Sequence, residues 1–172
     1  MESPKRGIHV TSAAVITCSN RSTLGERPDD SGNLLRTLLE DAGAVVVHRE
    51  IVPDEVKAIQ RAIGSALASG ADVVLTTGGT GLTPTDVTPE AVRPLLDREV
   101  PGIAEALRLV SREVVPTSVL SRGVAGTIGR ALIVTLPGSP GGVRDGMKLL
   151  VPLLDHAVEQ IAGGDHHHGG GV

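Results

Sequence analysis

The sequence predicts an α/β fold, a three-layer αβα sandwich around a mostly parallel central sheet. Strand-like and helix-like segments alternate three times along the first half of the chain, which is typical of parallel strands joined by right-handed crossovers. Val73, Val74 and Leu75 form a continuous apolar run, as expected for a strand covered on both faces. The chain contains no Phe, Trp or Tyr, which favours a core of small aliphatic side chains.

The elements of the first half follow from hydrophobic periodicity and from the glycines that end helices. Apolar runs predict the strands, and apolar residues at helical spacing predict the helices between them. The expected elements are a strand at residues 13–17, a helix from about Ser31 to Ala42 that ends at Gly43, a strand at 45–52, a helix capped by Asp54 that ends at Gly70, and a strand that ends at Thr77.

The second half contains more proline and is expected to have shorter elements. Proline interrupts helices and is tolerated at their first position. We expect a helix from Thr88 to about Arg98, a break at Pro101-Gly102, a helix from Ile103 to about Glu113, an irregular small-residue segment at 117–129, a strand at 131–136, and a final helix that starts at Ser139-Pro140 and is kinked or divided at Pro152.

Composition excludes several classes of function. The net charge is -4 and the pI is about 5.8, so no basic field attracts nucleic acid, and no aromatic side chain is present to stack on bases. We expect no membrane span and no signal peptide. Cys18 is the only cysteine, which suits a buried core residue in a reducing, cytoplasmic setting.

The length of 172 residues corresponds to one domain. We place that domain at residues 8–163 and expect flexible tails at 1–7 and 164–172. The second tail contains His166, His167 and His168 among glycines. Such a tract cannot pack, and we expect it to be disordered without a native metal role.

The densest cluster of functional signals follows the third expected strand. Gly78, Gly79 and Gly81 remove the Cβ atoms that would block a ligand, so main-chain N–H groups can contact a phosphate. Thr88-Pro89-Glu90 has the composition of a helix start, and Asp86 lies between the glycines and that helix. An acid beside a phosphate repels it unless a divalent cation bridges the two. The run predicts an anion site that uses a metal ion, and an ordinary βα turn is the alternative.

Four polar segments follow the carboxyl ends of the expected strands, where parallel sheets bind their ligands. We expect them to converge on one site. Each also has an ordinary interpretation, because Ser31 and Asp54 are suitable N-caps and Pro-Gly-Ser-Pro is a competent turn. The segments are Ser19, Asn20, Asp30, Ser31 and Gly32 after the first strand, Asp54 after the second, residues 78–86 after the third, and Pro137, Gly138, Ser139 and Pro140 after the last.

Two familiar nucleotide motifs do not fit the glycine loop. The loop lacks the Gly-Lys-Ser/Thr ending of a P-loop, and Pro84 stands where a Rossmann fingerprint needs glycine.

A separate polar strip is formed by Glu105, Arg108 and Ser111, which recur every three residues on one expected helix. Its spacing alone is more typical of a solvated face with a Glu–Arg pair than of a ligand site.

Seven segments occur in order between about Ile8 and Gly163: Asp30-Ser-Gly32, Val52-Pro-Asp54, Thr77-Gly-Gly-Thr-Gly81, Asp86-Val-Thr-Pro-Glu90, Glu105-Ala-Leu-Arg108, Leu120-Ser-Arg122 and Leu136-Pro-Gly-Ser-Pro140. Together they resemble the molybdopterin adenylyltransferase family, the Mog/MoaB-like proteins of molybdenum cofactor biosynthesis, related to domains of gephyrin and of plant cofactor-insertion proteins. The resemblance implies the molybdopterin-binding fold and adenylyl transfer from MgATP to the terminal phosphate of molybdopterin, with release of pyrophosphate. It also implies a homotrimer and a downstream molybdate-insertion protein as partner.

By position, the resemblance implies roles for individual residues. Asp54 and Asp86 match the carboxylates required for adenylylation and for Mg²⁺. One departure is Asn20, where many members carry Asp. Asn can hydrogen-bond a ribose or a base but cannot hold Mg²⁺ by charge. Further matching positions are the phosphate and pterin loop Gly78, Gly79, Thr80 and Gly81, and the pocket residues Glu105, Arg108, Ser111, Ser121 and Arg122.

The implied chemistry requires no protein base. A phosphate monoester has a second pKa of about 6 and is largely ionised at neutral pH, so the obstacle is repulsion between two polyanions. Mg²⁺ held by Asp86 and Asp54, with main-chain N–H groups and arginine, would screen them. Two alternatives stay open: a non-catalytic pterin-binding carrier of the same pathway, and a scaffold domain like that of gephyrin, which no linker or appended domain in this chain supports.

Overall fold

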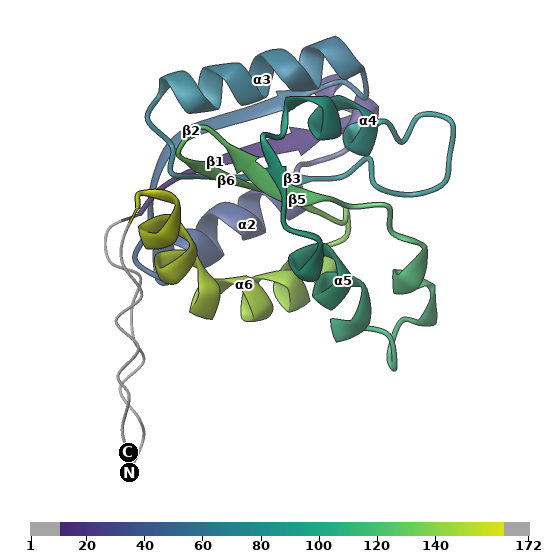
Figure 1. Ribbon diagram of the computed structural model, residues 1–172. Coiled ribbons are helices and arrows are strands. Elements are labelled where there is room, and N and C mark those ends of the chain that lie inside the picture. Colours follow the sequence, from purple (N-terminus) through teal and green to yellow (C-terminus); the bar gives the residue numbers. More distant parts are fainter. Residues whose placement is uncertain (1–10, 164–172) are drawn as a thin grey trace.

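A six-stranded sheet lies between two layers of helices (Figure 1) in the computed structural model, which describes residues 11–163. The strand order is β2-β1-β3-β6-β5-β4. Strands β2, β1, β3 and β6 are parallel, whereas β5 is antiparallel to β6 and to β4. The predicted mostly parallel αβα sandwich is therefore confirmed. The strands are β1 (Ser12–Cys18), β2 (Val45–Val52), β3 (Val73–Thr77), β4 (Arg98–Glu99), β5 (Ala125–Ile128) and β6 (Ala131–Leu136).

The helices divide between the two faces of the sheet. Helices α2, α5 and α6 cover one face, and α3 and α4 cover the other (Figure 1). The helical elements are α1 (Asn20–Thr23), α2 (Asp30–Asp41), α3 (Val56–Ala68), α4 (Thr88–Val92), α5 (Pro101–Val110), α6 (Pro140–Ile161), and the 3₁₀ turns η1 (Arg93–Leu95) and η2 (Pro116–Leu120).

Alternate residues of each central strand enter two separate aliphatic cores. In β1, Ala13 and Val15 pack toward α2 and α6, whereas Ala14 and Ile16 pack toward α3, as the two-residue period of a strand requires. All four are fully buried. Because both faces are covered, these strands appear in the sequence as continuous apolar runs.

Several boundaries agree with the sequence-based expectations. Strands β2 and β6 have the expected ends, and the helix-ending Gly43 and Gly70 adopt φ values of 99° and 80°, the left-handed conformation that glycine tolerates best. Ser139 caps α6, accepting a hydrogen bond from Gly142 N at 3.1 Å. Helix α6 then runs through Pro152 without being divided.

The region between Thr88 and Gly129 was predicted less well. The helix expected from Thr88 to about Arg98 is wrong, because α4 ends at Val92 and gives way to η1 and β4. Pro94 lies within η1 and has no N–H to donate to a continuing α-helix. Residues 117–129 were expected to be irregular but include η2 and β5. In β5, a Cβ on Gly126 would lie 2.3 Å from Arg98 O, so glycine permits the close approach of β4.

Some expectations fall outside the described residues. The tails at 1–7 and 164–172, and the histidines within the second one, are among them, as is the start of the expected domain at residue 8. Within residues 11–163, no helix is long and apolar enough to cross a membrane.

Candidate functional site

Two adjoining cavities lie where β1, β3 and β6 end. The larger cavity has a volume of about 560 Å³ and the smaller one about 320 Å³. They share Gly79, Asp86 and Gly138. The four polar segments that follow the strands are distributed around these cavities. Ser19, Asn20, Asp30, Ser31, Asp54 and Gly78 line the smaller cavity, and Thr80, Gly81, Pro137 and Ser139 line the larger.

The glycine loop after β3 requires glycine for its own geometry. Gly78 and Gly79 have φ values of 98° and 69°, in the left-handed region that favours glycine. A Cβ on Gly78 would lie 2.3 Å from Cys18 O, and one on Gly79 would lie 2.2 Å from Thr88 Oγ1. The loop therefore packs closely against the end of β1 and the start of α4, and it forms the boundary between the two cavities.

The start of α4 differs from the expected cap. Thr88 is the first residue of the helix, and Val87, which occupies the N-cap position, provides no side-chain cap hydrogen bond. The buried Thr88 hydroxyl donates to Gly78 O at 2.9 Å, and Thr88 N donates to Gly79 O at 3.0 Å. Thr88 thus fixes the glycine loop instead of capping the helix.

Asp54 is held by a reciprocal pair of hydrogen bonds with Asn20. Asp54 Oδ2 accepts from Asn20 N at 3.0 Å, and Asn20 Oδ1 accepts from Asp54 N at 2.8 Å. The expectation that Asp54 caps α3 is wrong, because Glu55 occupies the N-cap position and α3 has no side-chain cap hydrogen bond. Asn20 therefore joins the ends of β1 and β2 and orients the Asp54 carboxylate.

The second carboxylate oxygen of Asp54 is unusual for a buried atom. Asp54 Oδ1 is buried and has no hydrogen-bond partner among the described residues. Burial raises the pKa of Asp54 above its ordinary value, the nearby charge of Asp86 adds to this rise, and the hydrogen bond from Asn20 opposes it. Buried polar atoms are normally satisfied, so Oδ1 is a candidate ligand atom for a cation.

Asp86 lines both cavities and is fixed by its own loop. Its Oδ2 accepts hydrogen bonds from Thr83 N at 3.0 Å and from Thr83 Oγ1 at 2.7 Å, and neither bond uses Oδ1. A Cβ on Gly81 would lie 2.7 Å from Asp86 Oδ2. The half-buried Asp86 and Asp54 thus both line the smaller cavity.

A buried acid that the sequence does not single out also lies at this cavity. Asp29 caps α2 through Gly32 N at 2.9 Å, and its Oδ2 accepts from Thr17 Oγ1 and from Arg49 Nη2, both at 2.9 Å. The acid predicted from the sequence, Asp30, is exposed at the edge of the same cavity. From the sequence alone, Asp29 and Asp30 are equally good N-cap candidates. Only their partners in the fold distinguish them, because Thr17 and Arg49, which are distant in sequence, both donate to Asp29.

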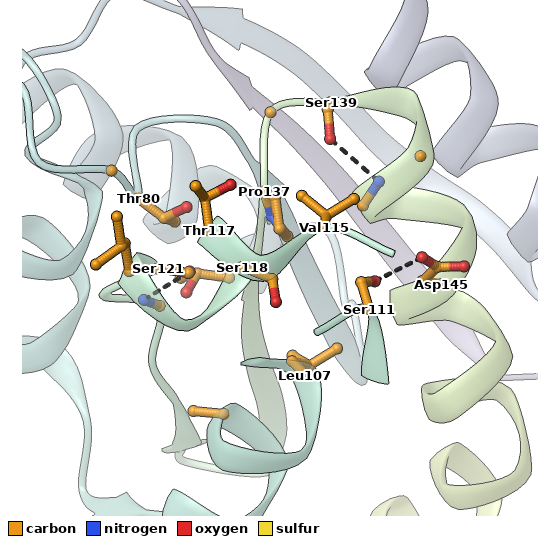
Figure 2. A pocket seen from close by; sticks show the side chains of 18 of the residues that line it. Thr80, Leu107, Ser111, Val115, Thr117, Ser118, Ser121, Pro137, Ser139 and Asp145 are labelled. Atoms are coloured by element: carbon orange, nitrogen blue, oxygen red, sulfur yellow. Dashed lines mark hydrogen bonds between the residues drawn. The ribbon is translucent and has the colours of Figure 1, made fainter. Parts of the chain in front are cut away.

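Helix α5 and the segment after it form one wall of the larger cavity (Figure 2). Arg108 donates to Ser121 O and Gly123 O at 3.4 and 3.2 Å, and Ser118 Oγ donates to Arg108 O at 2.8 Å. Ser111 and Ser121 line the cavity. Glu105 is exposed and lies outside the lining. The predicted polar strip therefore separates into a cavity residue, a residue that braces the wall, and a solvent-facing acid.

Arg122 braces the glycine loop. Its Nε donates to Gly81 O at 2.8 Å, its Nη2 donates to Asp86 O at 2.7 Å, and its Nη1 pairs with Glu90. The hydrogen bond to the Glu90 carboxylate raises the pKa of Arg122 and lowers that of Glu90. These contacts occupy the guanidinium with the protein, and Arg122 is not part of the lining of either cavity.

Comparisons with known proteins identify the kind of chain that carries this site. Residues 14–156 match the family described as "Probable molybdopterin binding domain". Molybdenum cofactor biosynthesis protein B of Bacillus cereus is 43% identical over 86% of this chain and 88% of its own. A molybdopterin biosynthesis protein from Mycobacterium abscessus has a crystal structure that superposes with a TM-score of 0.85, at 44% identity over 90% of this chain and 98% of that one. Gephyrin of Dictyostelium discoideum is 38% identical over 86% of this chain, which spans 22% of that protein.

Proposed function

The chain belongs to the family of molybdopterin-binding domains of molybdenum cofactor biosynthesis proteins, and from this premise we propose that it is a molybdopterin adenylyltransferase. It transfers the adenylyl group of MgATP to the terminal phosphate of molybdopterin. A molybdopterin phosphate oxygen attacks the α-phosphorus of ATP, the bond from that phosphorus to the bridging oxygen breaks, and pyrophosphate leaves.

One observation supports this proposal above the others: the two cavities meet at Asp86, Gly79 and Gly138. A transfer between two phosphorylated molecules needs two binding spaces that share a boundary, so that the reacting groups come within reach. Asp86 lies at that boundary, and Asp54, whose Oδ1 is buried without a hydrogen-bond partner among the described residues, lines the smaller cavity.

The charges around the cavities favour one placement of the substrates. Arg21 and Arg27 line the smaller cavity, and guanidinium groups match phosphate oxygens in charge and geometry. Among the described residues, no Lys, Arg or His lines the larger cavity, whose walls include Leu107, Val115 and Leu120. We assign the ATP phosphates to the smaller cavity and the uncharged fused ring of molybdopterin to the larger one.

The residues fit a magnesium ion bound together with substrate phosphates. Within residues 11–163, no three or more His, Cys, Asp or Glu side chains gather as a metal-sized cluster. Mg²⁺ is commonly held by only one or two carboxylates plus phosphates, and the unpartnered Asp54 Oδ1 with Asp86 provides that set. When bound, the ion would offset the negative charge of the phosphates. Asn20 contributes no charge, and its role is to orient Asp54.

The chain itself has to bring two anions together rather than move a proton. Molybdopterin phosphate is largely ionised at neutral pH and needs no general base. Cys18 is no candidate nucleophile, because burial raises the pKa of its thiol to about 12. Thr88 and Arg122 hold the glycine loop through Gly78 O and Gly81 O, so the shared boundary is formed before the substrates bind.

Pyrophosphate release tests this activity. Purified protein, ATP, Mg²⁺ and molybdopterin should release pyrophosphate, and omitting molybdopterin should abolish the release. Asp86→Asn should keep the fold and pterin binding and lose most of the turnover. Asp41→Asn is the matched control, since it makes the same change in an exposed acid at the end of α2. Wild-type turnover in Asp86→Asn would remove Asp86 from catalysis. Pterin binding without pyrophosphate release by the wild type would instead identify a carrier protein.

We further propose that the protein is a cytoplasmic homotrimer that passes its product to a molybdate-insertion protein. Exposed aliphatic side chains on α5 and after it provide a surface for self-association, and they include Leu109, Val110, Val114 and Val119. Light scattering coupled to size-exclusion chromatography should give three times the chain mass of 17.6 kDa. A monomer or dimer would refute the trimer without affecting the proposed chemistry.

A further inference from the structure

The larger cavity has an acid on the side away from the glycine loop. In Figure 2, Asp145 of α6 lies next to Ser111, while Thr80 of the glycine loop lies on the opposite side of the cavity. Asp86 and Asp145 are the two charged residues among the described residues that line it. Asp86 belongs to the boundary with the smaller cavity, so Asp145 is the charged group left to contact the part of a ligand farther from the phosphates.

Asp145 is held in place by a hydrogen bond, but no close ion pair offsets the negative charge of its carboxylate. Its Oδ2 accepts a hydrogen bond from Ser111 Oγ at 2.5 Å. Lys148 Nζ lies 4.0 Å from Oδ1, and its side chain is 79% exposed, so this pair is weak and screened by water. A carboxylate can accept about four hydrogen bonds. The Asp145 carboxylate can therefore accept further hydrogen bonds from the donor groups of a ligand in the cavity.

A pterin ring carries such donors on one edge. Its ring N3–H and its 2-amino group point the same way, and two adjacent donors match the two oxygens of a carboxylate as a guanidinium does. The pairing edge of adenine has one donor next to one acceptor, so a carboxylate cannot pair with it in this way. An acid in this cavity thus distinguishes a pterin from the adenine of the co-substrate.

We propose that Asp145 is the specificity-determining residue that binds the N3–H and 2-amino edge of the pterin, with Ser111 holding its carboxylate in place. This rests on the proposed function, because it assigns the larger cavity to the pterin. Leu107 and Val115, which line the same cavity, contact the faces of the ring in the absence of aromatic side chains. No covalent step is involved.

The test compares two ring systems that differ at position 2 of this edge and at the adjacent N1. The probes are 6-hydroxymethylpterin and 6-hydroxymethyllumazine, in which a carbonyl replaces the 2-amino group and N1 carries a hydrogen. Both rings fluoresce, and the chain has no Phe, Trp or Tyr, so titrations have no protein emission to subtract. The proteins are the full chain, Asp145→Asn, Asp145→Ala and the control Glu159→Gln, an exposed acid on the same helix. All titrations are run below the pKa of the ring N3–H.

We expect the wild type and Glu159→Gln to bind the pterin about ten- to a hundredfold more tightly than the lumazine, as loss of a hydrogen bond to a charged group predicts. Asp145→Ala should lose that preference. Asp145→Asn should also lose it, because an amide presents one acceptor and one donor, and both rings offer N3–H next to a carbonyl. Far-UV circular dichroism confirms that each variant is folded.

Two results would overturn the assignment: a wild type without preference for the pterin, or Asp145 variants that keep the wild-type ratio. Pyrophosphate release by the wild type is measured separately. Release combined with an unchanged ratio in the variants refutes the role of Asp145 alone, whereas absence of release refutes the transferase activity while the ratio still decides the role of Asp145.

Discussion

Replacing Gly79 by alanine should damage both the fold and the site. Its φ of 69° places alanine in the left-handed region, at a cost of about 1–2 kcal/mol. The new Cβ would also lie 2.2 Å from Thr88 Oγ1 and 3.2 Å from Asp54 Oδ1. Thr88 is fully buried and its hydroxyl donates to Gly78 O. Displacing the Thr88 side chain therefore breaks this buried hydrogen bond, at a cost of about 1–3 kcal/mol. The expected total is about 2–5 kcal/mol.

Two other glycines separate these contributions. Gly70 has a φ of 80°, and no atom lies within 4 Å of the position that an added Cβ would take, so Gly70→Ala should show the conformational cost alone. Gly64 lies inside α3 and also has open space around it, so Gly64→Ala should stabilise the protein by about 0.5–1 kcal/mol. The difference between Gly79→Ala and Gly70→Ala therefore reports the cost of close packing.

Urea denaturation followed by far-UV circular dichroism measures all three variants, since the chain has no aromatic residue for fluorescence. Gly79→Ala should have the lowest free energy of unfolding and should also lose most pyrophosphate release, because its methyl group displaces the shared boundary of the cavities. If Gly79→Ala is no less stable than Gly70→Ala, the close approach to Thr88 is not what requires glycine there.

Three further predictions test other groups around the site. Because burial raises the pKa of Asp54, the native state binds more protons than the unfolded state just above the ordinary carboxyl pKa. Its contribution to the free energy of unfolding therefore falls as the pH rises through that range, and in magnesium-free urea titrations the free energy of unfolding of the wild type minus that of Asp54→Asn should fall with it. The thiol of Cys18, with its pKa raised to about 12, should react with a disulfide reagent only after unfolding, and rapid labelling of the native protein would contradict its burial. Arg122→Lys should lower kcat by about ten- to a hundredfold with the fold retained, because lysine cannot hold Gly81 O, Asp86 O and Glu90 together; an unchanged kcat in steady-state assays would show that the brace is dispensable.

The central strands could be predicted because their signals are local. Strands 45–52 and 131–136 are apolar segments bounded by turn residues, and the structure gives the same ends. The short strands β4 and β5 could not be predicted in this way. They pair with each other only through Arg98 with Thr127 and Glu99 with Gly126, β5 continues the sheet over residues 125–128 alone, and such short strands leave no hydrophobic period in the sequence.

The surroundings of the site residues were harder to predict than their positions along the chain. Asp54 was expected to cap a helix, yet its carboxylate binds Asn20, which lies 34 residues away. Arg122 was selected as a pocket residue, but its guanidinium is directed to the glycine loop and Glu90. In both cases a partner distant in sequence competes with the local or ligand-binding role, and local patterns carry no information about that competition.

The sequence by itself determined the order of the four parallel strands and of the helices between the first three of them, the aliphatic core, and the glycine-rich loop with Asp86 beside it, because each depends on neighbouring residues and their conformational preferences. Only the tertiary structure decided that Asp54 keeps a buried oxygen without a partner among the described residues, that Asp29 rather than Asp30 is buried, and that Asp145 faces the larger cavity. These properties depend on hydrogen bonds and burial between segments that meet only when the sheet and its two helical layers assemble.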